Sequence, residues 1–401
     1  MYNHRFRGTL PIRGRISTAR DRTPPAQSTT DRLAAKTPGP PAPTLRGALR
    51  ALRANTRYRL GKALTRVLAA RSYSARLEPR DIRSVLIVRI NARMGNTVFL
   101  TPLLGRLQEL MPFATIDLAC AYPHASGLIG PLPGVRRVVT FPYKGAQLPW
   151  RYWVALRRLR AERYDLVIDP TPNSTGARLV LMLAHARFRL GYASDNQWAP
   201  LTHAVPLPQQ PLHQAMQPVY LLSEALGAPV DPGTIRLALA LTPHELASGR
   251  AAIAAALRER ARAGLAVGFF GHATGAKRIP PGYWRAFWDA FLALEPQAVP
   301  VEFLPSPASP PVEARSVALH FPAPRELTAA IAATSLFISA DAGPMHLAGS
   351  TPVATVALFR ASDPLLYGPL KGCDLALDAT QLSPHAVAER CSRLWRAALR
   401  A

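Results

Sequence analysis

Residues 336–359 read LFISADAGPMHLAGSTPVATVALF, and this stretch decides the fold. An apolar run at 336–338 leads into the turn DAGP at 341–344, a short helical run covers 345–349, and a β-rich run covers 353–359. A strand, a tight turn, a helix and a second strand in this order form the unit of a doubly wound parallel sheet. The stretch therefore predicts an α/β protein.

The turn between these elements has the features of an anion site. Gly343 lets the backbone approach a ligand closely, and Pro344 suits the first position of a helix. Unpaired N–H groups at the start of a helix attract phosphate, and His346 can add a hydrogen bond or a positive charge. The local chemistry predicts a phosphate or pyrophosphate pocket. The alternative, with equal weight, is an ordinary α/β turn in which Asp341 only caps the helix.

Length and composition set the limits. A chain of 401 residues with 48% hydrophobic residues can form two domain cores. Its three cysteines, Cys120, Cys373 and Cys391, are scattered and indicate neither a disulfide framework nor a zinc site. No apolar stretch of about 18 residues predicts a transmembrane helix, and no secretory signal is visible. We therefore expect a cytoplasmic protein.

The net charge of +25 is concentrated at the start of the chain, where residues 1–80 hold 18 Lys and Arg against three acids. Residues 1–44 are rich in Pro, Thr and Arg and are predicted to be disordered. Residues 45–73 place leucines at helical spacing among basic residues. Such a helix can lie peripherally on the anionic inner face of the cytoplasmic membrane, or pack as a solvated helix on the first domain. The rest of the chain shows no basic stripe interleaved with aromatics, so nucleic acid is not the expected partner.

Strand and helix patterns alternate in a first domain, 84–240. It opens with the apolar strand SVLIVRI at 84–90, a loop at 91–95, and a helix that Asn96 starts. Further strands are predicted at 114–120, 136–141 and 164–170, with helical runs at about 148–162 and 176–186. Alternation of this kind indicates a parallel sheet with helices on both faces.

A second domain, 241–380, begins where Thr242 and Glu245 form a capping box. Its first strand, 266–272, runs into the loop HATGAKR at 272–278, which can present backbone N–H groups and Lys277 to phosphate. A plain surface loop with a lysine is the alternative. A last helix is expected within 381–401.

Both domains resemble glycosyltransferase family 9, the ADP-heptose:lipopolysaccharide heptosyltransferases, over about residues 84–370. The residues that carry the resemblance are MGN at 94–96, TPLL at 101–104, PFATID at 112–117, DAGPMHLAGS at 341–350, SDP at 362–364 and YGP at 367–369. The resemblance implies a GT-B fold, two Rossmann-like domains facing a cleft, whose last helix could cross back onto the first domain. It also implies transfer of a sugar from an ADP-sugar to an anionic glycolipid such as lipopolysaccharide core, with inversion and without a cofactor or metal.

The resemblance assigns roles residue by residue. On the donor side, Thr274 and Lys277 contact phosphates, Met345 lies beside the base or ribose, and the pyrophosphate and nucleotide are held by Asp341, Gly343 and His346. On the acceptor side lie Arg93 and Asn96.

One departure bears on catalysis. The family usually has an aspartate, taken as the base for the acceptor hydroxyl, where this chain has Asn96. An amide serves equally well as a helix cap but cannot accept a proton near neutral pH. Asp169, which ends the apolar run YDLVIDP, is the alternative base at the carboxyl edge of the first sheet, unless it merely caps the following turn.

Two other function classes can be compared with the sequence. A nucleotide-sugar-binding protein without turnover stays open because of Asn96. A nicotinamide-dependent oxidoreductase is disfavoured, since the loop at 91–95 has one glycine where that class needs three.

Overall fold

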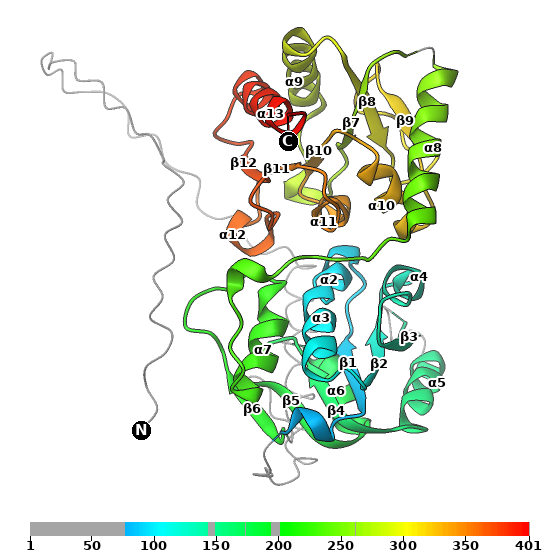
Figure 1. Ribbon diagram of the computed structural model, residues 1–401, viewed down its shortest axis with the longest axis vertical. Helices are drawn as coiled ribbons and strands as arrows, with labels where there is room; N and C mark the ends of the chain where they lie inside the picture. Colours follow the sequence, from blue (N-terminus) through cyan, green and yellow to red (C-terminus); the bar gives the residue numbers. More distant parts are fainter. Residues whose placement is uncertain (1–76, 143–148, 173, 194–200, 261, 401) are drawn as a thin grey trace, which may run out of the picture. The chain divides into compact units, whose positions relative to one another are not determined.

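The computed structural model describes residues 77–142, 149–172, 174–193, 201–260 and 262–400. The predicted disordered segment at 1–44 and the predicted amphipathic helix at 45–73 lie outside these residues. The described part forms two six-stranded parallel sheets (Figure 1).

The first sheet has the strand order β3-β2-β1-β4-β5-β6. Its strands are β1 (Ser84–Arg89), β2 (Thr115–Cys120), β3 (Val135–Thr140), β4 (Arg163–Asp169), β5 (His185–Ala193) and β6 (His203–Pro206). Its helices are α2 (Met94–Val98), α3 (Thr101–Leu110), α4 (Ala125–Ile129), α5 (Pro149–Arg160), α6 (Thr175–Leu183) and α7 (Met216–Leu226). A 3₁₀ turn, η1 (Pro79–Asp81), precedes β1.

Strand β1 shows why this sheet is buried on both faces. Val85 and Ile87 join the core formed with α2, α3, α4 and α7, and the alternate residues Leu86 and Val88 join the core formed with α5 and α6. A continuous apolar strand with helices on both sides is what a parallel sheet requires.

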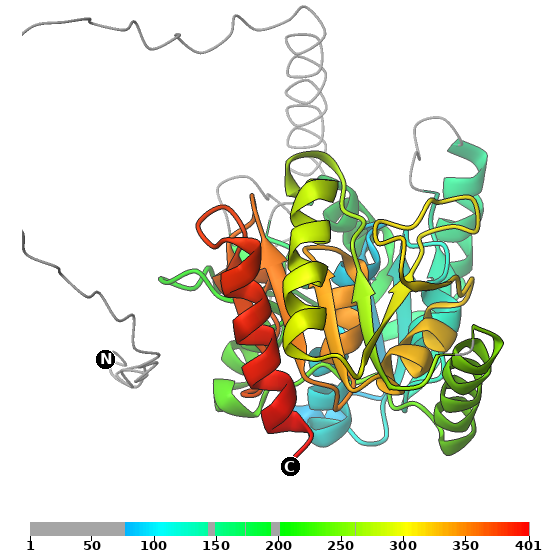
Figure 2. The ribbon, with the colours of Figure 1, turned by 90° about the horizontal axis from the view of Figure 1, so that it is seen from above.

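The second sheet has the order β12-β11-β10-β7-β8-β9. Its strands are β7 (Leu265–Phe270), β8 (Ala298–Phe303), β9 (Val317–Leu319), β10 (Leu336–Ala340), β11 (Thr355–Phe359) and β12 (Leu375–Asp378). Its helices are α8 (Pro243–Glu259), α9 (Pro281–Leu294), α10 (Pro324–Ala332), α11 (Gly343–Gly349), α12 (Pro364–Tyr367) and α13 (Pro384–Ala398). Figure 2 shows α9 and α13 side by side on one face of this sheet.

The doubly wound architecture is confirmed, but the last helix differs from the expectation. Helix α13 does not cross back onto the first domain; it packs on α9, where the Trp395 ring centroid lies 5.8 Å from that of Phe291. Glu295, just after α9, accepts hydrogen bonds from Ser392 and Arg396 at 2.5 and 2.6 Å. These apolar contacts with α9 and the hydrogen bonds to Glu295 keep α13 on the second domain. Among the described residues, no helix is long and apolar enough to cross a membrane.

Candidate functional site

Each sheet reverses its strand order at one point, between β1 and β4 in the first and between β7 and β10 in the second. Ligands of doubly wound sheets bind beyond the carboxyl ends of the strands at these reversals. All the predicted site residues lie at the ends of these four strands or in the loops and helices that directly follow them.

Lys277 and Asp341 meet beyond the ends of β7 and β10. Lys277 ends the short 3₁₀ turn η4 (Gly275–Lys277), which Gly275 enters at a φ of 61° and which the exposed Thr274 precedes. The Lys277 Nζ lies 2.8 Å from Asp341 Oδ2 and 5.7 Å from the ring centroid of Tyr367. A cation is thus held between two strand ends.

The ion pair decides the role of Asp341. The N-cap residue of α11 is Ala342, and no side chain accepts a hydrogen bond at that cap. Asp341 is 4% exposed, and it pairs with the lysine instead of capping the helix. The cap-only alternative is therefore wrong.

His346 has a different environment from the one predicted. It is 7% exposed, and its ring centroid lies 4.4 Å from that of Phe99 in the first domain. Burial lowers the pKa of His346 to about 3, with Asp341 opposing and His213 and Lys277 adding to the shift. The imidazole is therefore neutral at neutral pH, so it can offer a hydrogen bond but not the expected positive charge.

Helices α2 and α11 approach closely because of a glycine. A Cβ at Gly95 would stand 2.3 Å from His346 Cδ2, a ring that Phe99 already packs against. A Cβ at Gly343 would stand 2.6 Å from Met94 Cε, the end of a flexible side chain that can move aside. Gly95 is thus the stricter requirement for bringing the two helices together.

Met345 was predicted to lie beside the base or ribose, but its side chain does not reach the surface. Its side chain is fully buried in a small core with Ala357 and Phe359, against which Tyr367 packs. Because α11 turns this residue inward, Met345 supports Tyr367 rather than facing a ligand.

The acceptor-side residues lie at the start of α2. The helix begins at Met94 with Arg93 at the N-cap, so Asn96 occupies the third helical position, half-buried, and is not the cap. The predicted cap fails because Asn91 turns the chain earlier, its Oδ1 accepting the Arg93 N–H at 2.8 Å. The Arg93 residue is exposed.

Asp169 does not reach the surface. It is fully buried, with its Oδ2 3.2 Å from Arg178 Nε and its Oδ1 accepting the Thr171 N–H at 3.0 Å. Burial raises the pKa of Asp169 to about 6, while Arg178 and the Thr171 N–H oppose that rise. This geometry agrees with the turn-capping alternative and contradicts the role of base for an acceptor hydroxyl.

Arg89 is a site residue that the sequence reasoning missed. It ends β1, is 6% exposed, and donates from Nη1 to Thr171 Oγ1 at 3.3 Å. Burial lowers the pKa of the Arg89 guanidinium, and the nearby Asp169 opposes that shift. The available signal was a charged residue near the end of the apolar run at 84–90, because that end falls at the carboxyl edge of the sheet.

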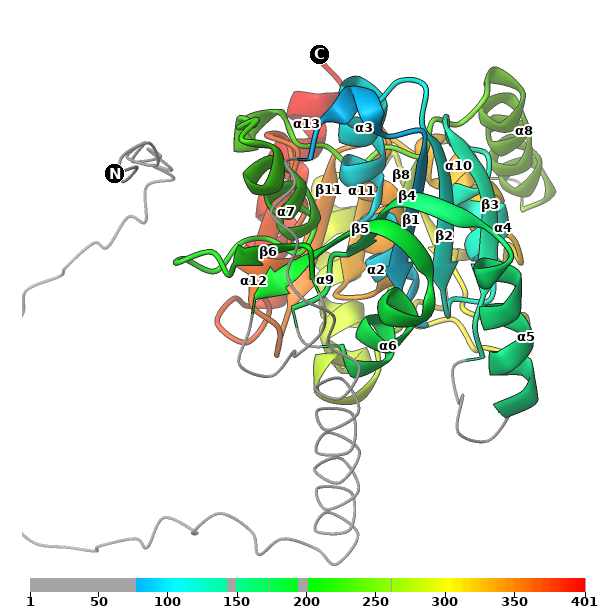
Figure 3. The ribbon, with the colours of Figure 1, turned by 90° about the horizontal axis from the view of Figure 1, so that it is seen from below.

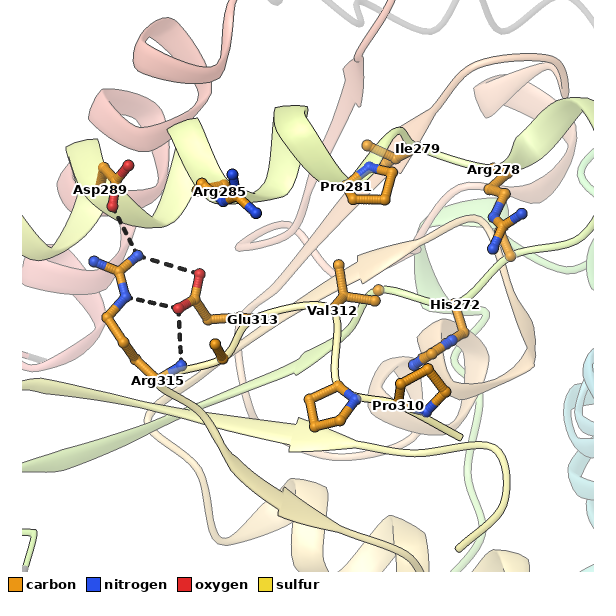
Figure 4. Close-up of a pocket in the computed structure, with 14 residues that line it drawn as sticks. His272, Arg278, Ile279, Pro281, Arg285, Asp289, Pro310, Val312, Glu313 and Arg315 are labelled. Atoms are coloured by element: carbon orange, nitrogen blue, oxygen red, sulfur yellow. Dashed lines mark hydrogen bonds and ion pairs between the residues drawn. The ribbon is translucent and has the colours of Figure 1, made fainter. Parts of the chain in front are cut away.

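A pocket of about 620 Å³ adjoins the Lys277 loop (Figure 4). The two ends of the loop at 271–279 (residues 271–273, 278 and 279), helix α9 and the segment 310–315 line it. Glu302, fully buried in β8, fixes that segment by accepting the Val312 N–H at 2.9 Å. Glu313 binds Arg315 at 2.6 Å, and Arg315 reaches Asp289 on α9 at 2.8 Å. In the described part of the chain, no three His, Cys, Asp or Glu side chains gather as metal ligands.

Comparisons with known proteins agree with this geometry. Residues 322–393 match the family model of glycosyltransferase family 9 (heptosyltransferase). A sequence search of the curated proteins found no match. A family 9 glycosyltransferase structure from Veillonella parvula is similar with a TM-score of 0.67 and 20% identity, over 80% of this chain and 99% of that one.

Two structures from E. coli are similar as well. Heptosyltransferase WaaC with ADP has a TM-score of 0.59 and 19% identity, over 79% of this chain and 100% of that one. ADP-heptose lps heptosyltransferase II has a TM-score of 0.60 and 19% identity, over 79% and 100%. The structures confirm the GT-B fold, and the family model covers the segment that holds Asp341, His346 and Tyr367. The family match thus rests on residues 322–393, and the fold of the described chain is that of the similar glycosyltransferase structures.

Proposed function

We propose that the protein transfers a heptose or a related sugar from an ADP-sugar to a lipopolysaccharide core or similar glycan, in one displacement with inversion. The observation that carries the proposal is the Lys277–Asp341 pair beside α11. Asp341 and α11 lie in the segment that the family model matches, whereas Lys277 comes from the loop after β7. The ADP-sugar class is supported by the similar E. coli WaaC, whose structures hold ADP and ADP-2-deoxy-2-fluoro heptose. The proposal uses no cofactor and no metal.

Charge develops on the β-phosphate as the bond to the sugar breaks. The Lys277 side chain is 36% exposed, so its ammonium can bind a phosphate oxygen while Asp341 holds it in place. The backbone N–H of Gly343 at the start of α11 and the hydroxyl of the exposed Thr274 would add further donors for the phosphates. Donors that are fixed before the reaction stabilise the transition state more than the ground state.

The nucleoside half of the donor would occupy the adjoining pocket. That pocket shares the loop at 271–279 with Lys277 and offers His272, Arg278 and Glu313 as polar contacts. Because Met345 is buried, base and ribose contacts come from this loop and from the segment 310–315.

The acceptor would approach α2 of the first domain. Arg93 is exposed there and suits an anionic glycan, and Asn96 can hold a hydroxyl by a hydrogen bond without taking its proton. We therefore expect transfer to be slower than in an enzyme with a carboxylate at position 96.

A nucleotide-sugar-binding protein without turnover is the second candidate, favoured by Asn96 and by the burial of Asp169. Incubation of the protein with ADP-heptose and a heptose-poor lipopolysaccharide core separates the two. Release of ADP together with a mass gain on the acceptor supports transfer. Saturable ADP binding with neither product selects the binding protein.

A further inference from the structure

Helix α5 presents an unusual outer face. Its inner face packs on the first sheet through Ala155 and Leu159, and Tyr152 lies 4.9 Å from Phe141 between ring centroids. Its outer face carries Trp150 and Trp153. Figure 3 shows α5 at the side of the first sheet, next to α6.

The two tryptophans are far more exposed than the other tryptophans that the structure describes. Trp150 is 61% and Trp153 57% exposed, whereas the large rings at 284, 288 and 395 are fully buried. Val154, 36% exposed, lies next to Trp150 on the same side of the helix, because positions 150, 153, 154 and 157 share one face. Neighbouring exposed apolar side chains of this kind mark an interaction site.

The charge around this apolar stripe has one sign. Arg151, Arg157 and Arg158 are exposed, and none forms an ion pair with an acid among the described residues. The guanidinium groups of Arg151 and Arg157 lie 5.2 and 5.5 Å from the ring centroids of Trp150 and Trp153.

The neighbouring acid does not balance these charges. Glu162, just beyond α5, is within 3.4 Å of Arg136 and 3.6 Å of Arg137. On α13, by contrast, the exposed Arg393 has Glu389 at 3.9 Å. The α5 face thus lacks the mixed charge of an ordinary solvated helix and is complementary to an anionic surface.

We propose that the outer face of α5 docks on the surface of an anionic phospholipid bilayer. Tryptophan rings favour the boundary between headgroups and acyl chains, and arginine binds lipid phosphates. An acidic protein or a nucleic acid would match the charge, but adjacent exposed tryptophans beside aliphatic Val154 favour a lipid boundary. The sequence predicts membrane contact only for residues 45–73 and does not reveal the α5 stripe, because helical spacing separates its members in the chain.

The placement of α5 fits such a surface. The helix connects the parallel strands β3 and β4, so it runs antiparallel to them, and its first turn lies toward the carboxyl edge of the sheet. Trp150 therefore lies toward the edge from which the loops after β1 and β4 leave. The proposal does not depend on which sugar is transferred.

The test uses the full chain and sedimentation with vesicles of phosphatidylglycerol mixed with phosphatidylcholine, against phosphatidylcholine alone. We expect the variant R151Q/R157Q/R158Q to bind the anionic vesicles about fivefold more weakly for each arginine removed. The variant W150S/W153S should also lose binding to these vesicles. The matched control R258Q/R390Q/R393Q removes the same charge from exposed positions on α8 and α13 and should bind like the wild type.

Tryptophan quenching by brominated lipids separates docking by α5 from attraction by the basic residues at 1–80. The wild type should be quenched on anionic vesicles, and W150F/W153F should keep vesicle binding but lose most of the quenching. The proposal is overturned if the α5 variants bind as the wild type does, or if the control loses as much as they do. It is also overturned if quenching is absent while RNA or an acidic protein binds through the α5 arginines.

Discussion

Replacing Lys277 by alanine perturbs the ion pair on which the donor site is built. The ammonium lies 2.8 Å from Asp341, and in the proposed complex it also binds a phosphate oxygen of the donor. The substitution removes one charge-assisted hydrogen bond to the ligand, worth about 1–3 kcal/mol, so the Kd for ADP should rise about 5- to 150-fold.

The same substitution also affects stability, because Asp341 is 4% exposed and loses its counter-ion. Breaking a fully buried pair costs about 3–5 kcal/mol, and the partial exposure of Lys277 reduces this to about 1–3 kcal/mol. Calorimetric titration with ADP and urea unfolding measure the two effects separately.

Lys371 supplies the matched control. It pairs with the buried Asp374 at 3.4 Å and donates to carbonyls of Thr351 and Val353, at the amino end of β11. Lys371→Ala should therefore cost stability and leave ADP affinity unchanged. Equal ADP affinity in Lys277→Ala and the wild type, or equal weakening in the two lysine variants, would refute the assignment of the donor site.

The remaining predictions concern the base, pH and packing. Asp169→Asn should leave turnover in a steady-state assay nearly unchanged, whereas loss of a general base would lower turnover by about 10²–10⁴-fold. Asn96→Asp should raise turnover by about 10²-fold in the same assay. Burial lowers the pKa of His213 to about 4 and of His346 to about 3, so both are neutral when folded. Each histidine contributes fully to the free energy of unfolding above about pH 6.5, and below that this free energy falls by about 1.4 kcal/mol per pH unit for each histidine. Urea unfolding between pH 7.5 and 5 should therefore show a smaller loss of stability in His346→Gln than in the wild type. Gly95→Ala should destabilise the protein by about 1–3 kcal/mol through overpacking on His346, and an unchanged urea midpoint would contradict that contact.

The fold was predictable where local pattern and burial agree. The runs at 85–88 and 336–338 are apolar without interruption, and both form central strands of parallel sheets. Strand β5 was missed because HARFRLGYA alternates arginines with apolar residues, a pattern typical of a half-exposed strand that partly overlaps the predicted helix at 176–186. Short strands such as β9 have too few residues to show a period.

The candidate site was predictable at the level of loops and not at the level of side chains. Lys277 and Asp341 were found because they follow strands, and strand ends meet at one edge. The burial of Met345 and Asp169 depends on which way α11 and β4 turn a side chain against distant residues, Phe359 in one case and Arg178 in the other. In each pair a loop separates the helix residue from the strand residue, so no helix or strand period in the sequence reveals the contact.

The structure of the protein bound to ADP tests the central claim most directly. The account predicts the β-phosphate within hydrogen-bonding distance of Lys277 Nζ and of the backbone N–H at the start of α11, with the nucleoside in the pocket beside the loop at 271–279. A diphosphate bound elsewhere, with Lys277 still paired only to Asp341, would contradict it.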